Sequence, residues 1–269
     1  MSGGRQRAAL GQNLFRSDAP ARTLVQGAGV QPGDLVYDLG AGTGRVTAAL
    51  LAAGARVVAV ELDPNLARKL AGRFPPTNVC VVEADLRQVA FRPPYRVVAN
   101  PPFNQTAAIM RRLLFEQPSP DSAALVLQRE AARKYAGAPR TTAISLAAQP
   151  WFALRVAETL DRRDLVPTPR VDVAVLRIER RAIPHLQIRE REAWGAFVRW
   201  AFSRPSGEAA RLFRPVLSRL QWRRLACDLA IDVAGRREEL TLDQWLGLYR
   251  FVRDHVPVSK RRKALTPAR

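Results

Sequence analysis

The chain has 269 residues, of which 47% are hydrophobic, so it is long and apolar enough for an α/β domain with a smaller partner and is not disordered. Its formal net charge of +19 comes mainly from arginine, which binds phosphate through two parallel hydrogen bonds and stacks on bases. This charge favours a nucleic acid over a membrane surface as the partner.

The cysteines, the histidines and the lengths of the apolar runs exclude further classes of protein. The two cysteines and two histidines are isolated, which excludes a disulfide framework and gives no metal-binding motif. No N-terminal segment resembles a signal peptide, and no run approaches the roughly 20 apolar residues that span a bilayer. We therefore expect a soluble, cytoplasmic protein that holds no metal and binds no membrane.

Short apolar runs alternate with amphipathic segments through the first two thirds of the chain, after a basic arm at 1–10 that carries Arg5 and Arg7. One helix is expected to begin at Ser17 or Asp18. Further helices are expected at 45–53, 64–72, 105–115, 129–136 and 141–149. Strands are expected at 35–39, 56–60, 78–82, 96–99, 123–127, 151–159 and 171–178. This alternation predicts a seven-stranded, mostly parallel, doubly wound sheet, whose last two strands could form an antiparallel hairpin around the loop 161–170.

The pattern becomes helical from about residue 183. Apolar residues recur there at helical spacing, at Trp194, Phe197, Val198 and Ala201, at Leu212, Val216 and Leu220, and at Trp245, Leu248 and Val252. We expect an α/β domain at 1–182 and a small all-helical domain at 183–269, which ends in a basic tail.

A glycine-rich loop follows the first strand of the predicted sheet. Gly40, Gly42 and Gly44 come after Asp38 with the spacing GxGxG, and Arg45 stands where the dinucleotide-binding fingerprint needs a small residue. Glycine lets a backbone approach a ligand closely. The N–H groups of such a loop can meet the carboxylate of an amino-acid cofactor, and Asp38 can meet its ammonium. The alternative is a turn that is simply tight.

Acids also end the next two strands. Glu61 stands where such folds often place a carboxylate that accepts hydrogen bonds from both ribose hydroxyls. Asp85 is placed to accept a hydrogen bond from an adenine amino group. Because the carboxyl ends of parallel strands share one edge of a sheet, Asp38, Glu61 and Asp85 indicate a nucleoside with an amino-acid tail, which is S-adenosylmethionine.

The segment Asn100-Pro101-Pro102-Phe103 ends the fourth strand, because proline cannot donate to a sheet ladder. An amide side chain, a backbone carbonyl and an aromatic ring then lie together at the ligand-binding edge. We interpret Asn100, Pro101 and Phe103 as catalytic. The Asn100 oxygen and the Pro101 carbonyl would accept the two hydrogens of an exocyclic amino group while it is methylated, and Phe103 would stack on the base.

With these motifs in place, the sequence resembles the class I methyltransferases, and more narrowly the Erm rRNA adenine N6-methyltransferases and their relatives that methylate small-subunit rRNA. The resemblance covers nearly all of 8–255 and includes Gln12-Asn13-Leu14-Phe15 and the Pro-x-Pro segment at 166–172. It departs from the family in the order of Leu14 and Phe15 and at Pro101, where the family more often has Ile or Leu.

The resemblance implies a role for each matched residue. Asn13 and Phe15 would line the methionine end of the cofactor, and Gly40 would lie under that end. Glu61 would meet the ribose and Asp85 the adenine, and Asn100 would bridge cofactor and target base.

The resemblance also implies a function: methyl transfer from S-adenosylmethionine to N6 of an adenine in 23S rRNA, which confers resistance to macrolide-class antibiotics. The alternatives are a small-subunit rRNA dimethyltransferase, a DNA adenine methyltransferase and an RNA-binding factor without catalysis. We expect a monomer acting on an unpaired adenine displayed by a folded stem-loop. Its basic surface would contact the RNA, with candidates at Arg111-Arg112, Arg129, Arg133-Lys134, Arg140, Arg162-Arg163 and in the helical domain.

Overall fold

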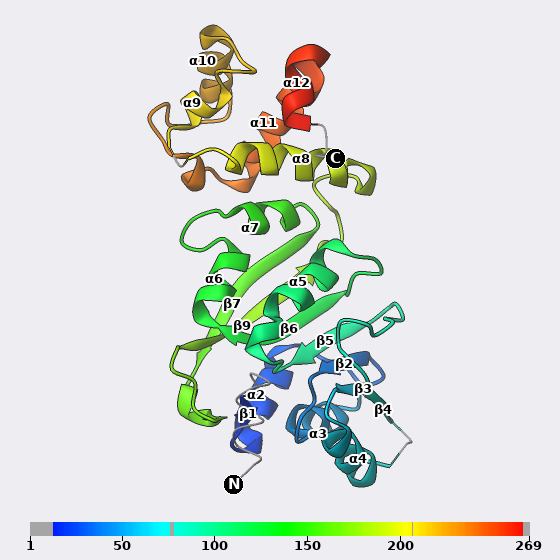
Figure 1. Ribbon diagram of the computed structural model, residues 1–269. Coiled ribbons are helices and arrows are strands. Elements are labelled where there is room, and N and C mark those ends of the chain that lie inside the picture. Colours follow the sequence, from blue (N-terminus) through cyan, green and yellow to red (C-terminus); the bar gives the residue numbers. More distant parts are fainter. Residues whose placement is uncertain (1–12, 76–77, 206, 266–269) are drawn as a thin grey trace. The chain divides into compact units, whose positions relative to one another are not determined.

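The computed structural model describes residues 13–75, 78–205 and 207–265, so the predicted basic arm with Arg5 and Arg7, as well as Gln12, lies outside the described residues. The chain forms two compact units (Figure 1). One contains the chain up to Ala136 together with Ala153–Arg180, and the other contains Gly137–Phe152 and the chain from Arg181 onward. The division of the sequence into domains at 182 and 183 stays a prediction.

A seven-stranded sheet forms the centre of the first unit, as predicted. Its strand order is β4 (Val79–Glu83), β3 (Arg56–Glu61), β2 (Leu35–Leu39), β5 (Arg96–Ala99), β6 (Ser122–Gln128), β9 (Val173–Arg180) and β7 (Phe152–Leu160). The neighbours from β4 to β6 are parallel, and β9 is antiparallel to β6. These strands are rich in buried β-branched and aliphatic residues, because helices cover both faces of the sheet.

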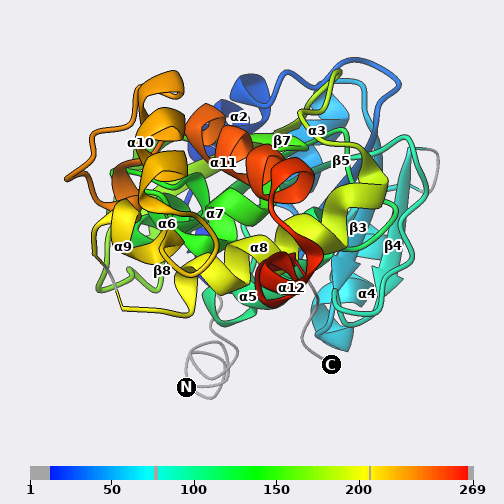
Figure 2. The ribbon, with the colours of Figure 1, turned by 90° about the horizontal axis from the view of Figure 1, so that it is seen from above.

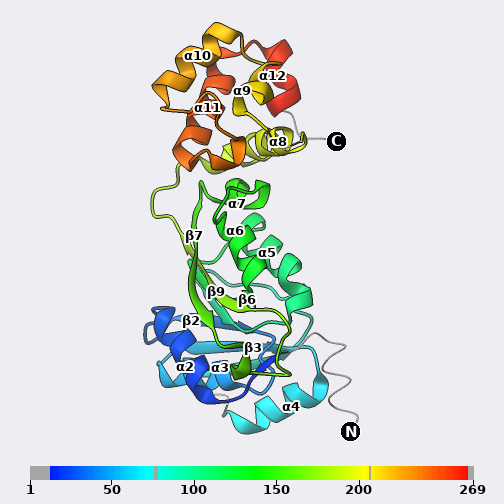
Figure 3. The same cartoon turned by 90° about the vertical axis from the view of Figure 1, so that its left-hand side faces the viewer.

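Helices connect the strands close to where the sequence predicts them: α2 (Asp18–Gly27), α3 (Arg45–Ala52), α4 (Pro64–Arg73), α5 (Thr106–Phe115) and α6 (Arg129–Ala136). Residues of α2 and α3 join one side of the sheet in a single buried apolar cluster. Figure 3 shows α5 and α6 beside β6, β9 and β7. Helix α4 begins after Asp63, whose carboxylate accepts hydrogen bonds from the Asn65 and Leu66 N–H groups.

A second, two-stranded sheet was not predicted. Strand β1 (Leu14–Phe15) pairs antiparallel with β8 (Leu165–Val166), with Leu14 opposite Val166 and Phe15 opposite Leu165. The region 161–170, predicted as a loop, therefore contains a strand that holds the N-terminal motif against the sheet domain. A strand of two residues shows no periodicity in the sequence, so only the resemblance to a family marked both segments.

The second unit is helical, with α7 (Ala143–Ala148), α8 (Arg191–Phe202), α9 (Ala209–Phe213), α10 (Arg219–Asp228), α11 (Leu242–His255) and α12 (Val258–Leu265) (Figure 2). Its core is aromatic: Trp194, Phe197, Phe213, Trp245 and Tyr249 are fully buried and contact one another. The predicted apolar face through Leu212, Val216 and Leu220 is wrong at Leu220, which is 61% exposed. The chain leaves α9 at Phe213 and begins α10 at Arg219, so these residues do not share one helix face.

Candidate functional site

The candidate site lies where β2, β3 and β5 end. Gly40, Gly42 and Gly44 all adopt left-handed backbone conformations, with φ of 78°, 58° and 78°, which favour glycine. A Cβ atom on Gly40 would lie 2.9 Å from Cδ of Pro102 and 3.6 Å from Cα of Pro101. The glycine loop and the Asn100–Phe103 segment, 60 residues apart in the chain, are therefore in contact, as their strand-end positions predict.

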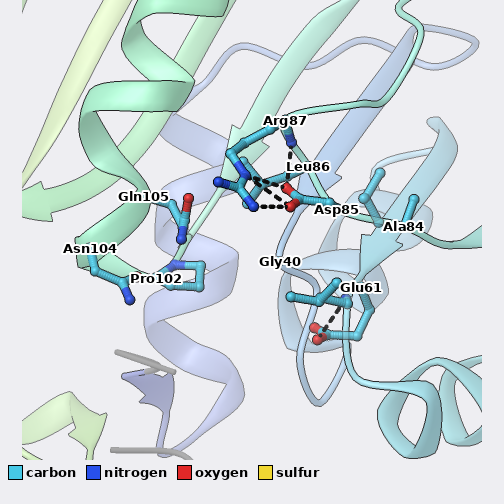
Figure 4. A pocket seen from close by; sticks show the side chains of 11 residues that line it. Gly40, Glu61, Ala84, Asp85, Leu86, Arg87, Pro102, Asn104 and Gln105 are labelled. Carbon is cyan, nitrogen blue, oxygen red and sulfur yellow. Dashed lines mark hydrogen bonds and ion pairs between the residues drawn. The ribbon is translucent and has the colours of Figure 1, made fainter. Parts of the chain in front are cut away.

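Two pockets meet at Gly40, which lines both of them. The Glu61 pocket is bounded by Glu61, Leu62, Asp85 and Arg87 on one side, and Figure 4 shows Pro102, Asn104 and Gln105 facing them. The Asp38 pocket is lined by residues of β1, β2, the glycine loop and the start of α3, and by the residue that follows β5. These include Leu14, Phe15, Asp38, Thr43 and Asn100.

Backbone N–H groups fix the carboxylate of Glu61, which is 1% exposed. One oxygen accepts a hydrogen bond from Gly42 N at 2.7 Å, and the other accepts from Leu62 N at 3.0 Å and Asp63 N at 2.9 Å. Because each carboxylate oxygen accepts about two hydrogen bonds, Oε1 is already saturated, and a hydroxyl in the pocket would approach Oε2. Glu61 is thus oriented by the glycine loop before any ligand arrives.

Asp85 lies in the same pocket and is held by a residue that sequence reasoning missed. Arg87 donates from Nε to both carboxylate oxygens, at 2.8 and 3.0 Å, and its backbone N–H donates to one of them at 2.9 Å. These hydrogen bonds from the Arg87 side chain lower the pKa of the Asp85 carboxyl below its usual range. An arginine two residues after a strand-end acid is the signal that could have revealed this pair.

Asp38 is also 1% exposed but is only partly satisfied. One oxygen accepts a hydrogen bond from the Thr47 hydroxyl at 2.7 Å, whereas Oδ1 has no partner among the described residues. Burial raises the pKa of Asp38 to about 7, although the hydrogen bond from Thr47 opposes the shift. A buried carboxylate with one open oxygen is a receptor for a cationic donor.

The Asn100 amide is likewise only partly satisfied by hydrogen bonds. Its Nδ2 donates to the backbone oxygen of Asn13 at 2.6 Å, which fixes the amide orientation because that oxygen can only accept. Its Oδ1 is buried and has no partner among the described residues. The Asn13 side chain donates in turn to the Pro167 carbonyl at 2.6 Å. Asn13 therefore enters the site through its backbone, and the β1–β8 pair supports the Asn100 amide.

The remaining predicted residues differ in burial. Phe15 is 5% exposed and belongs to the apolar core while also lining the Asp38 pocket. Pro101 is buried. Phe103 opens a short 3₁₀ helix (Phe103–Gln105), where its carbonyl accepts from the Thr106 hydroxyl at 2.8 Å, and its half-buried ring packs partly on the core.

Arg112 is not a surface arginine available to RNA, in contrast to the prediction. Its Nη1 donates to the Leu86 carbonyl at 2.7 Å, its Nη2 donates to the Val89 carbonyl, and its guanidinium lies 4.6 Å from the Phe91 ring centroid. Its side chain is 16% exposed, whereas that of Arg111 is 75% exposed. Arg112 therefore ties α5, which follows the Asn100 segment, to the loop that carries Leu86 into the Glu61 pocket.

Other classes of site are not found in the part of the chain that the structure describes. No group of three or more His, Cys, Asp and Glu side chains there could hold a metal ion. Both cysteines, Cys80 and Cys227, are free and exposed. Within the same residues, no helix has the length and apolar character needed to cross a membrane.

The arrangement fits a cofactor with an ammonium at one end and a nucleoside at the other. The open oxygen of Asp38 can accept a hydrogen bond from a positively charged donor, and the Glu61 pocket offers fixed acceptors beside the apolar Leu62 and Leu86. The open oxygen of Asn100 requires a further N–H donor. One bound molecule and its target could supply donors to both buried acceptors, and the roles expected for Asp38 and Asn100 stay predictions.

Comparisons with known proteins agree with this chemistry. Residues 3–252 match the family model described as ribosomal RNA adenine dimethylase. The chain is 34% identical over 249 residues to the mycinamicin-resistance protein MyrB of Micromonospora griseorubida, covering 91% of this chain and 78% of that protein. It is 34% identical over 256 residues to an rRNA adenine N-6-methyltransferase of Aeromicrobium erythreum, covering 92% and 74%.

A small-subunit relative is nearly as similar. Ribosomal RNA small subunit methyltransferase A of Leifsonia xyli subsp. xyli is 32% identical over 255 residues, which cover 89% of this chain and 90% of that protein. Among solved structures, the 23S rRNA methyltransferase ErmE superposes with a TM-score of 0.81 at 27% identity, over 90% of this chain and 100% of that one. The predicted class I methyltransferase fold with C-terminal helices is therefore confirmed.

Proposed function

This chain belongs to the ribosomal RNA adenine dimethylase family, and from that premise we propose that its substrate is an adenine of 23S rRNA and that N6 methylation there confers resistance to macrolide-class antibiotics. The family comprises S-adenosylmethionine-dependent rRNA adenine methyltransferases, so reaction class and cofactor are those expected from the sequence. The specific target, the resistance and the residue roles are the proposal. We further propose that the protein acts as a monomer on an unpaired adenine displayed by a folded stem.

The proposal of a 23S target rests mainly on the similarity to ErmE. The match covers 100% of the ErmE chain, and the TM-score is 0.81. The similarity to a mycinamicin-resistance protein over 91% of this chain supports resistance as the outcome. The second candidate is dimethylation of small-subunit rRNA. It is favoured by the 32% identity to a small subunit methyltransferase A, 90% of which is covered.

The two pockets support a proposed placement of the two ends of the cofactor. We place its ammonium at Oδ1 of Asp38, its ribose hydroxyls at Glu61 and its adenine beside Asp85, Leu62 and Leu86, with Gly40 under the junction. Left-handed Gly42 donates its N–H to Glu61, and this links the loop conformation to the ribose contact. When bound, S-adenosylmethionine supplies an electrophilic methyl group on a sulfonium sulfur.

The Asn100 segment acts on the target base. An adenine N6 is a weak nucleophile because its lone pair is delocalised into the ring. Oδ1 of Asn100 and the Pro101 carbonyl accept its two hydrogens, which turns the lone pair toward the methyl group and stabilises the positive charge that develops on nitrogen. Phe103 stacks on the target base after that base has left its stacked position in the RNA. Fixed positions replace a strong base here, and the proton leaves to water.

The test is methylation of protein-free rRNA. Purified protein is incubated with labelled S-adenosylmethionine and either 23S or 16S rRNA, and the modified nucleotide is mapped. We expect label at one adenine of 23S rRNA, and a raised macrolide resistance when the protein is expressed in a sensitive bacterium. Label confined to 16S rRNA would establish the small-subunit alternative instead.

A further inference from the structure

A groove on the helical unit is not explained by the cofactor site. It lies between the end of α9 and the first turns of α10. It is lined by three exposed arginines and by apolar groups: Arg214, Arg219, Arg223, Leu220, Trp222 and Val233. We call this feature the arginine groove.

The sequence explains how the arginines come together. Ser218 caps α10 by accepting from Gln221 N at 3.2 Å, and Gln221 accepts from Ser218 N at 2.9 Å in return. This capping box fixes the start of the helix, so Arg219 and Arg223, four residues apart, lie on one face. Arg214 approaches from the end of the preceding helix.

The charge in the arginine groove is uncompensated. Among the described residues, Arg214, Arg219 and Arg223 make no hydrogen bond or ion pair, and no acid lines the groove. Arg219 also opens a helix whose first turn carries no acidic residue, where the helix dipole disfavours a cation. Some arginines of this unit are paired instead, as Arg237 is with Glu238. The groove therefore has the electrostatics of an empty anion site.

Apolar and hydrogen-bonding features accompany the charge. Leu220 is 61% exposed and Val233 is 54% exposed, which leaves flat apolar surface beside the guanidinium groups. Trp222, only 6% exposed, lines the groove, and its indole N–H is buried without an acceptor among the described residues. Phosphate oxygens accept hydrogen bonds from guanidinium groups, and bases pack on aliphatic and guanidinium surfaces.

We propose that the arginine groove binds unpaired nucleotides of the rRNA substrate other than the adenine that is methylated. The inference rests on the proposed function only in taking rRNA as the substrate. In a single strand of RNA, phosphates alternate with bases, so phosphates can contact the arginines while bases contact the apolar side chains. An acidic protein segment would complement only the charge. The groove contributes affinity for the RNA and leaves the cofactor site unchanged.

The test compares two triple variants with the same loss of charge. In one, Arg214, Arg219 and Arg223 are changed to Gln. In the control, Arg189, Arg199 and Arg224 are changed to Gln, since these are exposed arginines of the same unit that do not line the groove. Binding of a 23S rRNA fragment that the wild type methylates is measured over a range of salt concentrations.

We expect the groove variant to bind the fragment at least about tenfold more weakly than the control at physiological salt. Its slope of log affinity against log salt should fall by about 2, because each contacted single-strand phosphate contributes about 0.7. KM for S-adenosylmethionine should not change. Equal affinities and slopes for the two triple variants would overturn the groove assignment.

Two further results separate other readings. If the groove variant binds naked rRNA like the control but loses methylation of a ribosomal particle, the groove contacts a ribosomal protein and the proposal is wrong. If the wild type methylates 16S instead of 23S rRNA, the proposed target fails, while the same pair of variants tests the groove on 16S rRNA. Leu220→Ser, at an exposed position, should weaken RNA binding without lowering the melting temperature.

Discussion

The two pockets that meet at Gly40 differ in how completely their polar groups are satisfied. In the Glu61 pocket, three backbone N–H groups hold Glu61 and Arg87 holds Asp85. In the Asp38 pocket, Asp38 and Asn100 each keep one buried oxygen without a partner among the described residues. The first pocket is preorganised, whereas the second is completed only by what binds there.

This difference indicates which residues should contribute most to the free energy of ligand binding. A buried unpaired acceptor destabilises the free protein by about 1–3 kcal/mol, and a ligand that supplies the donor recovers it. Substitutions at Asp38 and Asn100 should therefore change binding or catalysis strongly. Substitutions in the Glu61 pocket should have smaller effects, because the protein itself already satisfies those groups.

The largest effect is expected for Asn100→Ala. Loss of the carbonyl that accepts the target N–H should lower methyl transfer by about 10²- to 10³-fold, the usual cost of removing one preorganised polar group from a site where charge develops. Affinity for S-adenosylmethionine, measured separately by calorimetry, should change only a few-fold. The matched control is Asn65→Ala, an exposed amide of α4 that lines neither pocket, which should keep its activity. Turnover of the Asn100 variant within tenfold of wild type would contradict the role.

Asp38→Asn should come next, with an affinity for S-adenosylmethionine about 10- to 100-fold weaker. The reason is the loss of a charge-assisted hydrogen bond to the ammonium, worth about 1.5–3 kcal/mol. Asparagine keeps the size of the side chain, so the Thr47 contact and the fold should survive, which a melting curve checks. An unchanged dissociation constant would place the ammonium elsewhere.

The raised pKa of Asp38, about 7, gives a prediction for pH. Only the carboxylate form binds the ammonium, and below pH 7 the free protein holds the protonated form, so binding must release a proton. Affinity should thus be about tenfold weaker at pH 6 than at pH 8. In Asp38→Asn this dependence should disappear. A wild-type affinity that is flat between pH 6 and 8 would mean that Asp38 does not meet the ammonium.

In the Glu61 pocket, Arg112→Met should weaken cofactor binding about fivefold, because the Leu86 and Val89 carbonyls lose a donor and the loop loosens. Arg111→Met is the matched control, since it removes the same charge and the same partner, Glu116, without touching the loop. Arg112→Lys, which keeps the charge and a single donor nitrogen, should restore part of the affinity. Equal dissociation constants for the two Met variants would rule out this positioning role.

The smallest effect is expected for Asp85→Ala, about threefold to fivefold in cofactor affinity. Asp85 is half-buried and is neutralised by Arg87, so its hydrogen bond to the adenine gains little. Asp85→Asn, which keeps an acceptor, should lie between the wild type and Asp85→Ala. A loss for Asp85→Ala as large as that for Asp38→Asn would remove the distinction between the two pockets.

The sequence predicted the sheet because its strands are buried, β-branched runs between turn residues, and it predicted Asp38, Glu61, Asp85 and Asn100 because strand ends of a parallel sheet meet at one edge. It could not predict which carboxylates are satisfied. That depends on the Arg87 rotamer and on backbone N–H groups of the glycine loop, and neither has a signature in the pattern of residue types. The pairing of β1 with β8 was hidden for a similar reason, because two-residue strands have no period.

The burial of individual side chains was the other property that the sequence could not predict. Arg112 looks like any exposed helical arginine, yet its guanidinium donates to the Leu86 and Val89 carbonyls. Leu220 looks like a core residue at helical spacing, yet it is exposed beside the arginine groove. In both cases the tertiary partner, not the local pattern, decides the environment.

The most direct test of this account is a crossed measurement on Asn100→Ala and Asp38→Asn. For each variant, the dissociation constant for S-adenosylmethionine and the single-turnover rate of methyl transfer to rRNA at saturating cofactor are determined on the same preparation. The account predicts that Asn100→Ala binds the cofactor almost normally and transfers the methyl group at least about 100-fold more slowly, whereas Asp38→Asn binds weakly and transfers almost normally once saturated. Binding and transfer falling together in both variants would contradict it.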